Sequence, residues 1–191
     1  MSKRFIAAVS LLMAAACTAG VAQQTPTGQK FTMASSMQRG YHMLQQNLLE
    51  AAEKMPDADY SFRPTSQIRP FSQLVSHVAL AQFQSCSRLK GVDNPHANDK
   101  EEAVTKKADA VALLKASTEV CDSAFGSIND DNLTELVKAG PNEASRGLFL
   151  AGTNSHGNEM YGTMAVYLRL KGIVPPTTER EMKMKAGASG K

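Results

Sequence analysis

The feature that most constrains the fold is the helical spacing of apolar and small residues between Arg146 and Lys171. Such residues recur three or four positions apart, at Phe149, Gly152, His156, Met160, Thr163, Tyr167 and Leu170. This spacing predicts one face of a long α-helix, whereas a strand would need alternation with period two. Gly172 is suited to end the helix, and Pro175-Pro176 is expected to prevent a helix from starting again. A histidine therefore lies in the middle of the predicted inward face.

Three further segments show the same helical spacing. They are Thr32–Lys54, Phe71–Lys90, and a third segment from Asn98 or Asp99 to Ala124. A short extra helix is predicted between Asp130 and Lys138, and no strand pattern competes with the helices. Helices of this kind are stable in water only when they bury their apolar faces against one another. The sequence therefore predicts an all-α four-helix bundle over residues 31–176, with long connections after the first and third helices.

The two ends of the chain are expected to lie outside this bundle. Lys3 and Arg4 precede the apolar run Phe5–Ala16, and small residues follow up to Ala22, which is the layout of a secretory signal peptide. The run is shorter than the roughly 20 residues of a membrane span. We expect cleavage near Ala22 and a periplasmic or secreted protein; a lipoprotein anchored at Cys17 is the alternative. Residues 23–30 are predicted to be a disordered leader, and residues 177–191 a flexible tail.

Charge and cysteine content narrow the expected partners and leave one question open. The formal net charge is +3 at pH 7, and no basic patch with interleaved aromatic residues occurs. Nucleic acid is therefore not an expected partner. Cys86 and Cys121 lie on predicted neighbouring helices. In an oxidising compartment they either form a disulfide or stay as separately buried thiols, and the sequence leaves both states open.

The four histidines fall into two groups. His77 lies within the apolar arc of the second predicted helix, so it is expected to point inward as His156 does. His42 lies beside the stripe of the first helix, and His96 lies in a turn-rich loop. Both are expected at the surface. The inward pair is the candidate for function.

Several local sequences match those of a known family. They are the Phe62-Arg63-Pro64 turn, the histidine at position 77, and the pattern Y-L-R-x-K-G-I-x-P-P over Tyr167–Pro176. With these features the chain resembles the DinB-like superfamily, also called DinB/YfiT-like, from Asn47 to Gly91 and from His156 to Pro176. The resemblance spans most of the mature chain. It implies a helical bundle with the fold predicted above.

The resemblance also implies a metal site. Members with an intact site hold a divalent metal, often nickel or zinc, through one histidine of the second helix and two at H-x-x-x-H spacing in the fourth. Residues i and i+4 share a helix face, so two imidazoles can grip one ion while a facing helix supplies the third. The resemblance assigns His77 and His156 to two of these positions. The third falls on Met160, so the family's set of three histidines is broken.

Two interpretations of the broken site stay open. A thioether is a poor ligand for zinc or nickel and suits copper(I) better. Glu159 would supply an oxygen in its place if the helix rotated slightly, although glutamates at such flanking positions are usually solvated. Either a residual divalent-metal site persists at His77 and His156, or the two histidines only form hydrogen bonds and no metal is bound.

Two classes of function follow from these interpretations. The first is an exported binding or structural protein, whose partner is a small molecule or another envelope protein. The alternative, which the resemblance implies, is a metal-dependent enzyme of the thiol-transferase, isomerase or hydrolase type, whose open coordination position takes a thiol or water. Export argues against the thiol chemistry, because small thiol cosubstrates are mainly cytoplasmic. Relatives form dimers through helix faces, but no second apolar stripe here requires one.

Overall fold

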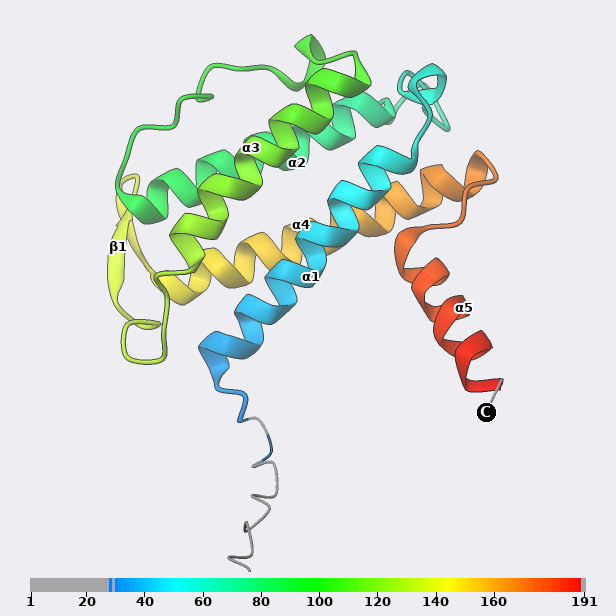
Figure 1. Ribbon diagram of the computed structural model, residues 1–191. Coiled ribbons are helices and arrows are strands. Elements are labelled where there is room, and N and C mark those ends of the chain that lie inside the picture. The colour runs from blue at the N-terminus through cyan, green and yellow to red at the C-terminus, as the bar shows by residue number, and fades with distance from the viewer. Residues whose placement is uncertain (1–27, 29, 190–191) are drawn as a thin grey trace, which may run out of the picture. The chain divides into compact units, whose positions relative to one another are not determined.

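The computed structural model describes residue 28 and residues 30–189 of the chain. Helices α1 (Met33–Lys54), α2 (Phe71–Lys90), α3 (Lys107–Phe125) and α4 (Arg146–Leu170) form a four-helix bundle, which confirms the predicted fold class. Helix α2 packs along α3 and α1 packs against α4, and α2 also contacts α4 (Figure 1). The smaller elements are the turns η1 (Asp57–Asp59) and η2 (Glu101–Ala103), the strands β1 (Leu136–Ala139) and β2 (Asn142–Ser145), and helix α5 (Pro176–Ser189).

Some predictions concern residues that the structure does not describe. The predicted signal peptide over 1–22, with Cys17 in it, and most of the predicted leader over 23–30 lie outside the described residues. Among the helices of residues 30–189, none combines the length and the apolar character that a membrane crossing needs.

Short-range sequence explains where the bundle helices begin and end. Thr32 accepts a hydrogen bond from the backbone N–H of Ser35, and the Ser35 hydroxyl accepts one from the backbone N–H of Thr32, which closes a capping box on α1. Ser145 caps α4 by accepting from the backbone N–H of Leu148. Helix α2 ends at Gly91, whose φ of 67° lies in the left-handed region that glycine adopts without strain.

The buried face of α4 is displaced by one position from the predicted stripe. Its buried residues are Gly147, Leu150, Thr153, Gly157, Tyr161, Met164, Ala165, Tyr167 and Leu168. Of the predicted stripe only Tyr167 is buried, while His156 and Met160 are partly exposed. A Cβ atom at Gly157 would meet the Leu44 Cδ2 atom at 2.5 Å, so the missing side chain lets α1 approach α4 closely along this row. His156 consequently lies at the border of the core.

The third helix begins later than predicted. It starts at Lys107, and residues 91–106 form a long connection that includes η2. The Ser76 hydroxyl donates a hydrogen bond to the Glu101 carbonyl at 3.1 Å, which fixes this connection to α2. The Glu101 carboxylate contacts His77 of α2 and Arg69 of the loop that precedes α2. These contacts favour the turn over an earlier start of the helix.

The predicted short helix over 130–138 is wrong. Strands β1 and β2 form an antiparallel hairpin instead, with Ala139 paired to Asn142 and Leu136 paired to Ser145. The two residues between the strands are Gly140 and Pro141, and Gly140 has a φ of 68°. A glycine with positive φ at the first loop position is typical of a tight hairpin turn. The Gly-Pro pair was the signal that identifies a hairpin here.

A helix replaces the predicted flexible tail. Helix α5 extends to Ser189, and residues 190–191 lie outside the described residues. Its polar sequence contacts the bundle through charges: Glu179 pairs with Lys54 of α1 at 2.5 Å, and Arg180 pairs with Glu50. The Tyr161 hydroxyl of α4 lies 2.9 Å from the Thr177 hydroxyl oxygen. Ion pairs with α1 thus fix a segment that has no apolar stripe of its own.

The attachment of α5 is expected to weaken in acid. Hydrogen bonds from Lys54 and then Lys183 lower the pKa of Glu179 from 4.5 to about 2. A carboxyl whose folded pKa is lowered contributes stability above its unfolded pKa, and that contribution is lost as the pH falls through the folded pKa. We therefore expect hydrogen exchange of α5 to accelerate relative to α1 between pH 4.5 and 2. The Glu179→Gln variant should show this faster exchange already at neutral pH, and equal exchange in both proteins there would contradict the prediction.

Candidate functional site

The two inward-predicted histidines meet between α2 and α4. The Nε2 atoms of His77 and His156 are 3.2 Å apart, and the ring centroids are 5.2 Å apart with the planes inclined at 63°. Both side chains are partly buried, because His156 lies beside the core row of α4 and His77 beside that of α2. Two imidazole nitrogens bound to one tetrahedral ion at about 2.0–2.1 Å lie roughly 3.3 Å apart. The spacing therefore suits either a direct hydrogen bond or two ligands of one cation.

A carboxylate fixes the ring of His77 from the other side. Oε2 of Glu101 lies 2.7 Å from Nδ1 of His77, and Oε1 of Glu101 accepts a hydrogen bond from Nε of Arg69 at 2.5 Å. An ionised carboxylate can only accept, so the N–H is on Nδ1 of His77. When His77 is neutral, its Nε2 atom then carries the lone pair and accepts from the N–H of His156. Arg69, Glu101, His77 and His156 thus form one polar chain.

Burial disfavours the protonated form of the second histidine. It lowers the pKa of His156 below its usual value, the nearby His77 adds to this effect, and Arg69 contributes less. Glu159 opposes them and raises the pKa. A neutral imidazole is the form that either donates one hydrogen bond to its partner or binds a metal.

The resemblance assigns the third ligand position to residue 160, which is a methionine and offers the histidine pair no nitrogen or oxygen. Met160 is partly buried and packs against the main apolar cluster. Together with Arg69, Glu101 and Tyr167 it also lines a cavity of about 540 Å³. Glu159 is exposed on the neighbouring position. Within residues 30–189 no three histidine, cysteine, aspartate or glutamate side chains come close enough to hold one metal ion.

The arrangement therefore fits the family's metal site only in part. Two imidazoles converge, and a carboxylate orients one of them, as is usual for histidine ligands of metals. The position that the resemblance assigns to the third ligand holds a thioether, which is a poor ligand for zinc or nickel. A closed three-histidine centre does not fit these residues.

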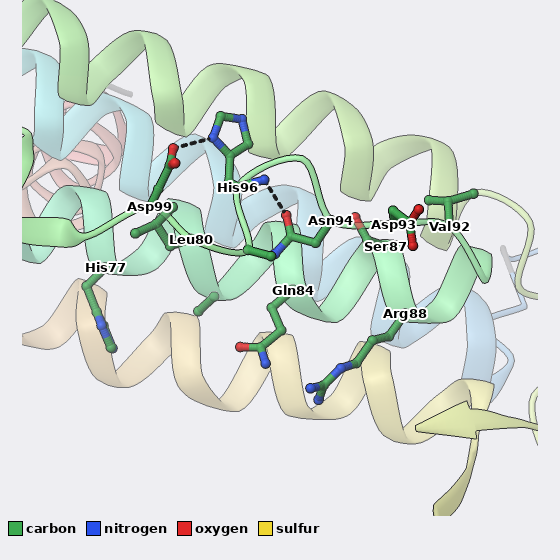
Figure 2. A pocket seen from close by; sticks show the side chains of 12 residues that line it. His77, Leu80, Gln84, Ser87, Arg88, Val92, Asp93, Asn94, His96 and Asp99 are labelled. Atoms are coloured by element: carbon green, nitrogen blue, oxygen red, sulfur yellow. Dashed lines mark hydrogen bonds and ion pairs between the residues drawn. The ribbon is translucent and has the colours of Figure 1, made fainter. Parts of the chain in front are cut away.

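The other two histidines lie apart from the pair; His42 is exposed as predicted, but His96 is partly buried and not at the surface. His42 is exposed and lies 3.9 Å from Asp122. The Nδ1 atom of His96 is 2.8 Å from an oxygen of Asp99 (Figure 2). The ring centroids of His96 and Phe83 are 4.1 Å apart, with the planes tilted by 37°. His96 and His77 line the same cavity of about 430 Å³, between α2 and the connection that follows it. Neither His42 nor His96 approaches the pair closely enough to share a hydrogen bond.

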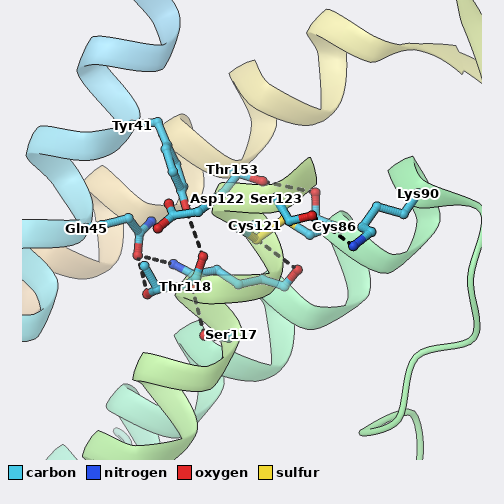
Figure 3. Close-up of a disulfide and its surroundings, with 12 residues drawn as sticks. Tyr41, Gln45, Cys86, Lys90, Ser117, Thr118, Cys121, Asp122, Ser123 and Thr153 are labelled. Carbon is cyan, nitrogen blue, oxygen red and sulfur yellow. Dashed lines mark hydrogen bonds between the residues drawn. A yellow bond between two sulfur atoms is a disulfide. The ribbon is translucent and has the colours of Figure 1, made fainter. Parts of the chain in front are cut away.

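Cys86 and Cys121 are joined by a disulfide that links α2 to α3. Their Cα atoms are 5.1 Å apart, and both residues are fully buried (Figure 3). A buried polar network lies beside the bond. In it Gln82 donates to Gln45 at 2.9 Å and accepts from Ser117 at 2.8 Å. The covalent link and this network hold α2 at a fixed position against α1 and α3.

Sequence reasoning missed the residues that support the histidine pair. No sequence pattern distinguishes Glu101 from the charged residues around it, but its side chain is only 17% exposed. No sequence motif includes Arg69, although its carbonyl also accepts a hydrogen bond from the Tyr167 hydroxyl at 2.6 Å. No short motif joins these residues, because Glu101 lies 24 positions from its histidine partner and 32 from its arginine partner.

The fold is a helical bundle with a histidine pair between its second and fourth helices. The sequence model of the DinB superfamily matches residues 41–164, which is more than half of the chain. The chain belongs to the DinB superfamily, as the local motifs indicated. No functionally curated protein matches the sequence.

Solved structures show the same fold at low sequence identity. A DinB-like protein from Bacillus cereus matches with a TM-score of 0.63 at 15% identity, over 73% of this chain and 93% of that one. A DinB-like protein from Bacillus subtilis matches with a TM-score of 0.58 at 20% identity, over 72% and 92%. A mutant of mycothiol-dependent maleylpyruvate isomerase matches with a TM-score of 0.55 at 12% identity, over 68% and 61%. At these identities the likeness extends to the fold alone.

Proposed function

We propose that this protein is a small-molecule-binding member of the DinB superfamily, in which the metal centre of the family is reduced to a hydrogen-bonded histidine pair. The observation that carries the proposal is the composition of the site. His77 and His156 meet at 3.2 Å, while position 160 offers a sulfur instead of a third imidazole. With two protein ligands a divalent ion is held far more weakly than with three, and water competes for the other positions.

Metal-dependent catalysis is the second candidate, and one observation favours it. The cavity beside Met160 contains Arg63 and Arg69 and is large enough for a small substrate at about 540 Å³. One of the solved structures with this fold is a mycothiol-dependent isomerase. Such an activity would need a bound cation at His77 and His156, so metal content separates the two candidates.

We also propose that the protein is exported. The sequence up to Ala22 has the layout of a signal peptide, and the Cys86–Cys121 disulfide is of the kind that persists in oxidising compartments. Untagged protein purified from the envelope fraction of its native cell should have an intact mass that begins at Gln23. A mass that retains the first 22 residues would contradict export through cleavage there.

The same untagged preparation tests the binding proposal. Elemental analysis should find zinc and nickel well below one equivalent, and neither ion should shift the midpoint of thermal unfolding when added. Stoichiometric zinc or nickel that disappears in the His77→Ala and His156→Ala variants would overturn the proposal. The His42→Ala variant is the matched control, because that exposed histidine lies outside the pair.

A further inference from the structure

A second concave site lies next to the histidine pair, between α2, α4 and the hairpin. It has a volume of about 330 Å³, at the lower end of the range for small-molecule sites. Its apolar walls come from three elements: Leu148 and Phe149 of α4, Ala139 and Ala144 of the hairpin, and Ala81 of α2. We call this site the hairpin groove. Leu148 is 60% exposed, so an apolar surface faces the open side of the groove.

One charged residue lines the hairpin groove, and it is positive. Arg88 extends from α2 on the side of α4, as does Gln84 one turn earlier (Figure 2). Among the described residues, the Arg88 guanidinium takes part in no ion pair or hydrogen bond, whereas Arg69, Arg146 and Arg180 are each paired with a glutamate. An unpaired guanidinium beside an apolar surface is complementary to an anion with an apolar body.

The floor of the hairpin groove is open because Gly152 has no side chain. A Cβ atom there would have no other atom within 4 Å. Gly152, Ala81 and Ser85 also line a neighbouring cavity of about 160 Å³ that reaches His156. A glycine inside a helix costs about 1 kcal/mol relative to alanine, so an open floor at this place is obtained at the expense of helix stability.

We propose that the hairpin groove binds a small amphipathic carboxylic acid. The carboxylate pairs with the Arg88 guanidinium, and the apolar body lies over Gly152 against Leu148 and Phe149. This assignment rests on the binding role proposed above and specifies its ligand class. A planar guanidinium recognises a carboxylate through two parallel hydrogen bonds, and the apolar walls exclude a fully polar anion from most of the groove. The groove offers no charge that would recognise a cation.

The ligand class is tested with 2-naphthoate and 2-naphthalenemethanol, which share one aromatic body and differ in charge. Calorimetry on metal-free protein should show binding of the acid and much weaker binding of the alcohol. Charge-assisted hydrogen bonds of this kind correspond to roughly a tenfold to hundredfold change in affinity. The Arg88→Gln variant should therefore lose about that factor for the acid and leave the alcohol unaffected. Equal affinities of acid and alcohol for the wild-type protein would overturn the assignment of a carboxylate.

The location is tested with a matched pair of glycines on α4. Gly152 and Gly162 are both exposed, and a Cβ atom at either would have no other atom within 4 Å, but only Gly152 lines the groove. Gly152→Leu should fill the floor and weaken 2-naphthoate binding by more than tenfold, while Gly162→Leu should bind like the wild type. Both variants should fold, since leucine is a better helix former than glycine. Unchanged binding of 2-naphthoate to Gly152→Leu would overturn the site, as would the absence of binding to the wild type at millimolar 2-naphthoate. Neither result would change the metal content, which tests the proposed function separately.

Discussion

Replacing Met160 with histidine is expected to give a variant that binds zinc or nickel tightly. Residue 160 is four positions from His156 on the same helix, so the new imidazole would lie on the same face, toward His77. A third nitrogen ligand completes the set that a catalytic zinc site uses. We expect an affinity gain on the order of a hundredfold, or about 2.7 kcal/mol, in isothermal titration with zinc and with nickel.

The Met160 experiment has internal controls. Met160→Leu keeps the apolar contact with the main cluster but offers no ligand, so it should bind metal no better than the wild type. The gain of Met160→His should disappear when His77→Ala is added, because the helix α2 ligand is then missing. A Met160→His variant with wild-type affinity would show that the pair and position 160 do not converge on one point.

Removing the disulfide is expected to be the largest single change in stability. Cys86 and Cys121 are 35 positions apart, and the chain-entropy estimate for a loop of that length is roughly 4 kcal/mol at 25 °C. The Cys86→Ala/Cys121→Ala double variant should therefore lose about 2–4 kcal/mol in the free energy of unfolding measured with urea. Alanine is preferred to serine because both positions are fully buried and a hydroxyl would need a partner.

Reduction provides an independent measurement of the same bond. Dithiothreitol should lower the unfolding midpoint of the wild-type protein toward that of the double variant and leave the double variant unchanged. Titration of the unfolded, unreduced protein should find no free thiol from Cys86 or Cys121. Two titratable thiols in protein from an oxidising compartment would contradict the bond.

The main helices could be predicted because each has a long run of apolar residues with helical period and a clear end. Two of the wrong predictions share a different physical cause, because tertiary contacts outweighed the local pattern there. Residues 91–106 do not continue a helix, because Glu101 is held by His77 and Arg69. Residues 176–189 are helical next to Lys54 and Glu50 of α1, although their own sequence has no stripe. The hairpin was missed because its strands are short and mixed in polarity.

The residues of the candidate site that lie on helices could be predicted from helical spacing, whereas those in connections could not. The helical spacing predicted that His77 and His156 point inward from their helices, and the structure places them in contact. Their partners Glu101 and Arg69 lie in connections, where no periodicity relates position to direction. Arg88 and Gly152 likewise carry no motif, and their common groove exists only once the hairpin is in place.

The offset between the core row of α4 and the row of His156 and Met160 affects how such a protein can change over time. Gly157, Tyr161, Met164 and Leu168 hold the helix in the bundle, and they lie one position away from the histidine row. Substitutions at 156 and 160 thus disturb the buried row less than substitutions at 157 or 161 would, although Met160 also contacts the main cluster. A lineage can exchange one ligand chemistry for another on this row, or abandon it, while the scaffold stays intact.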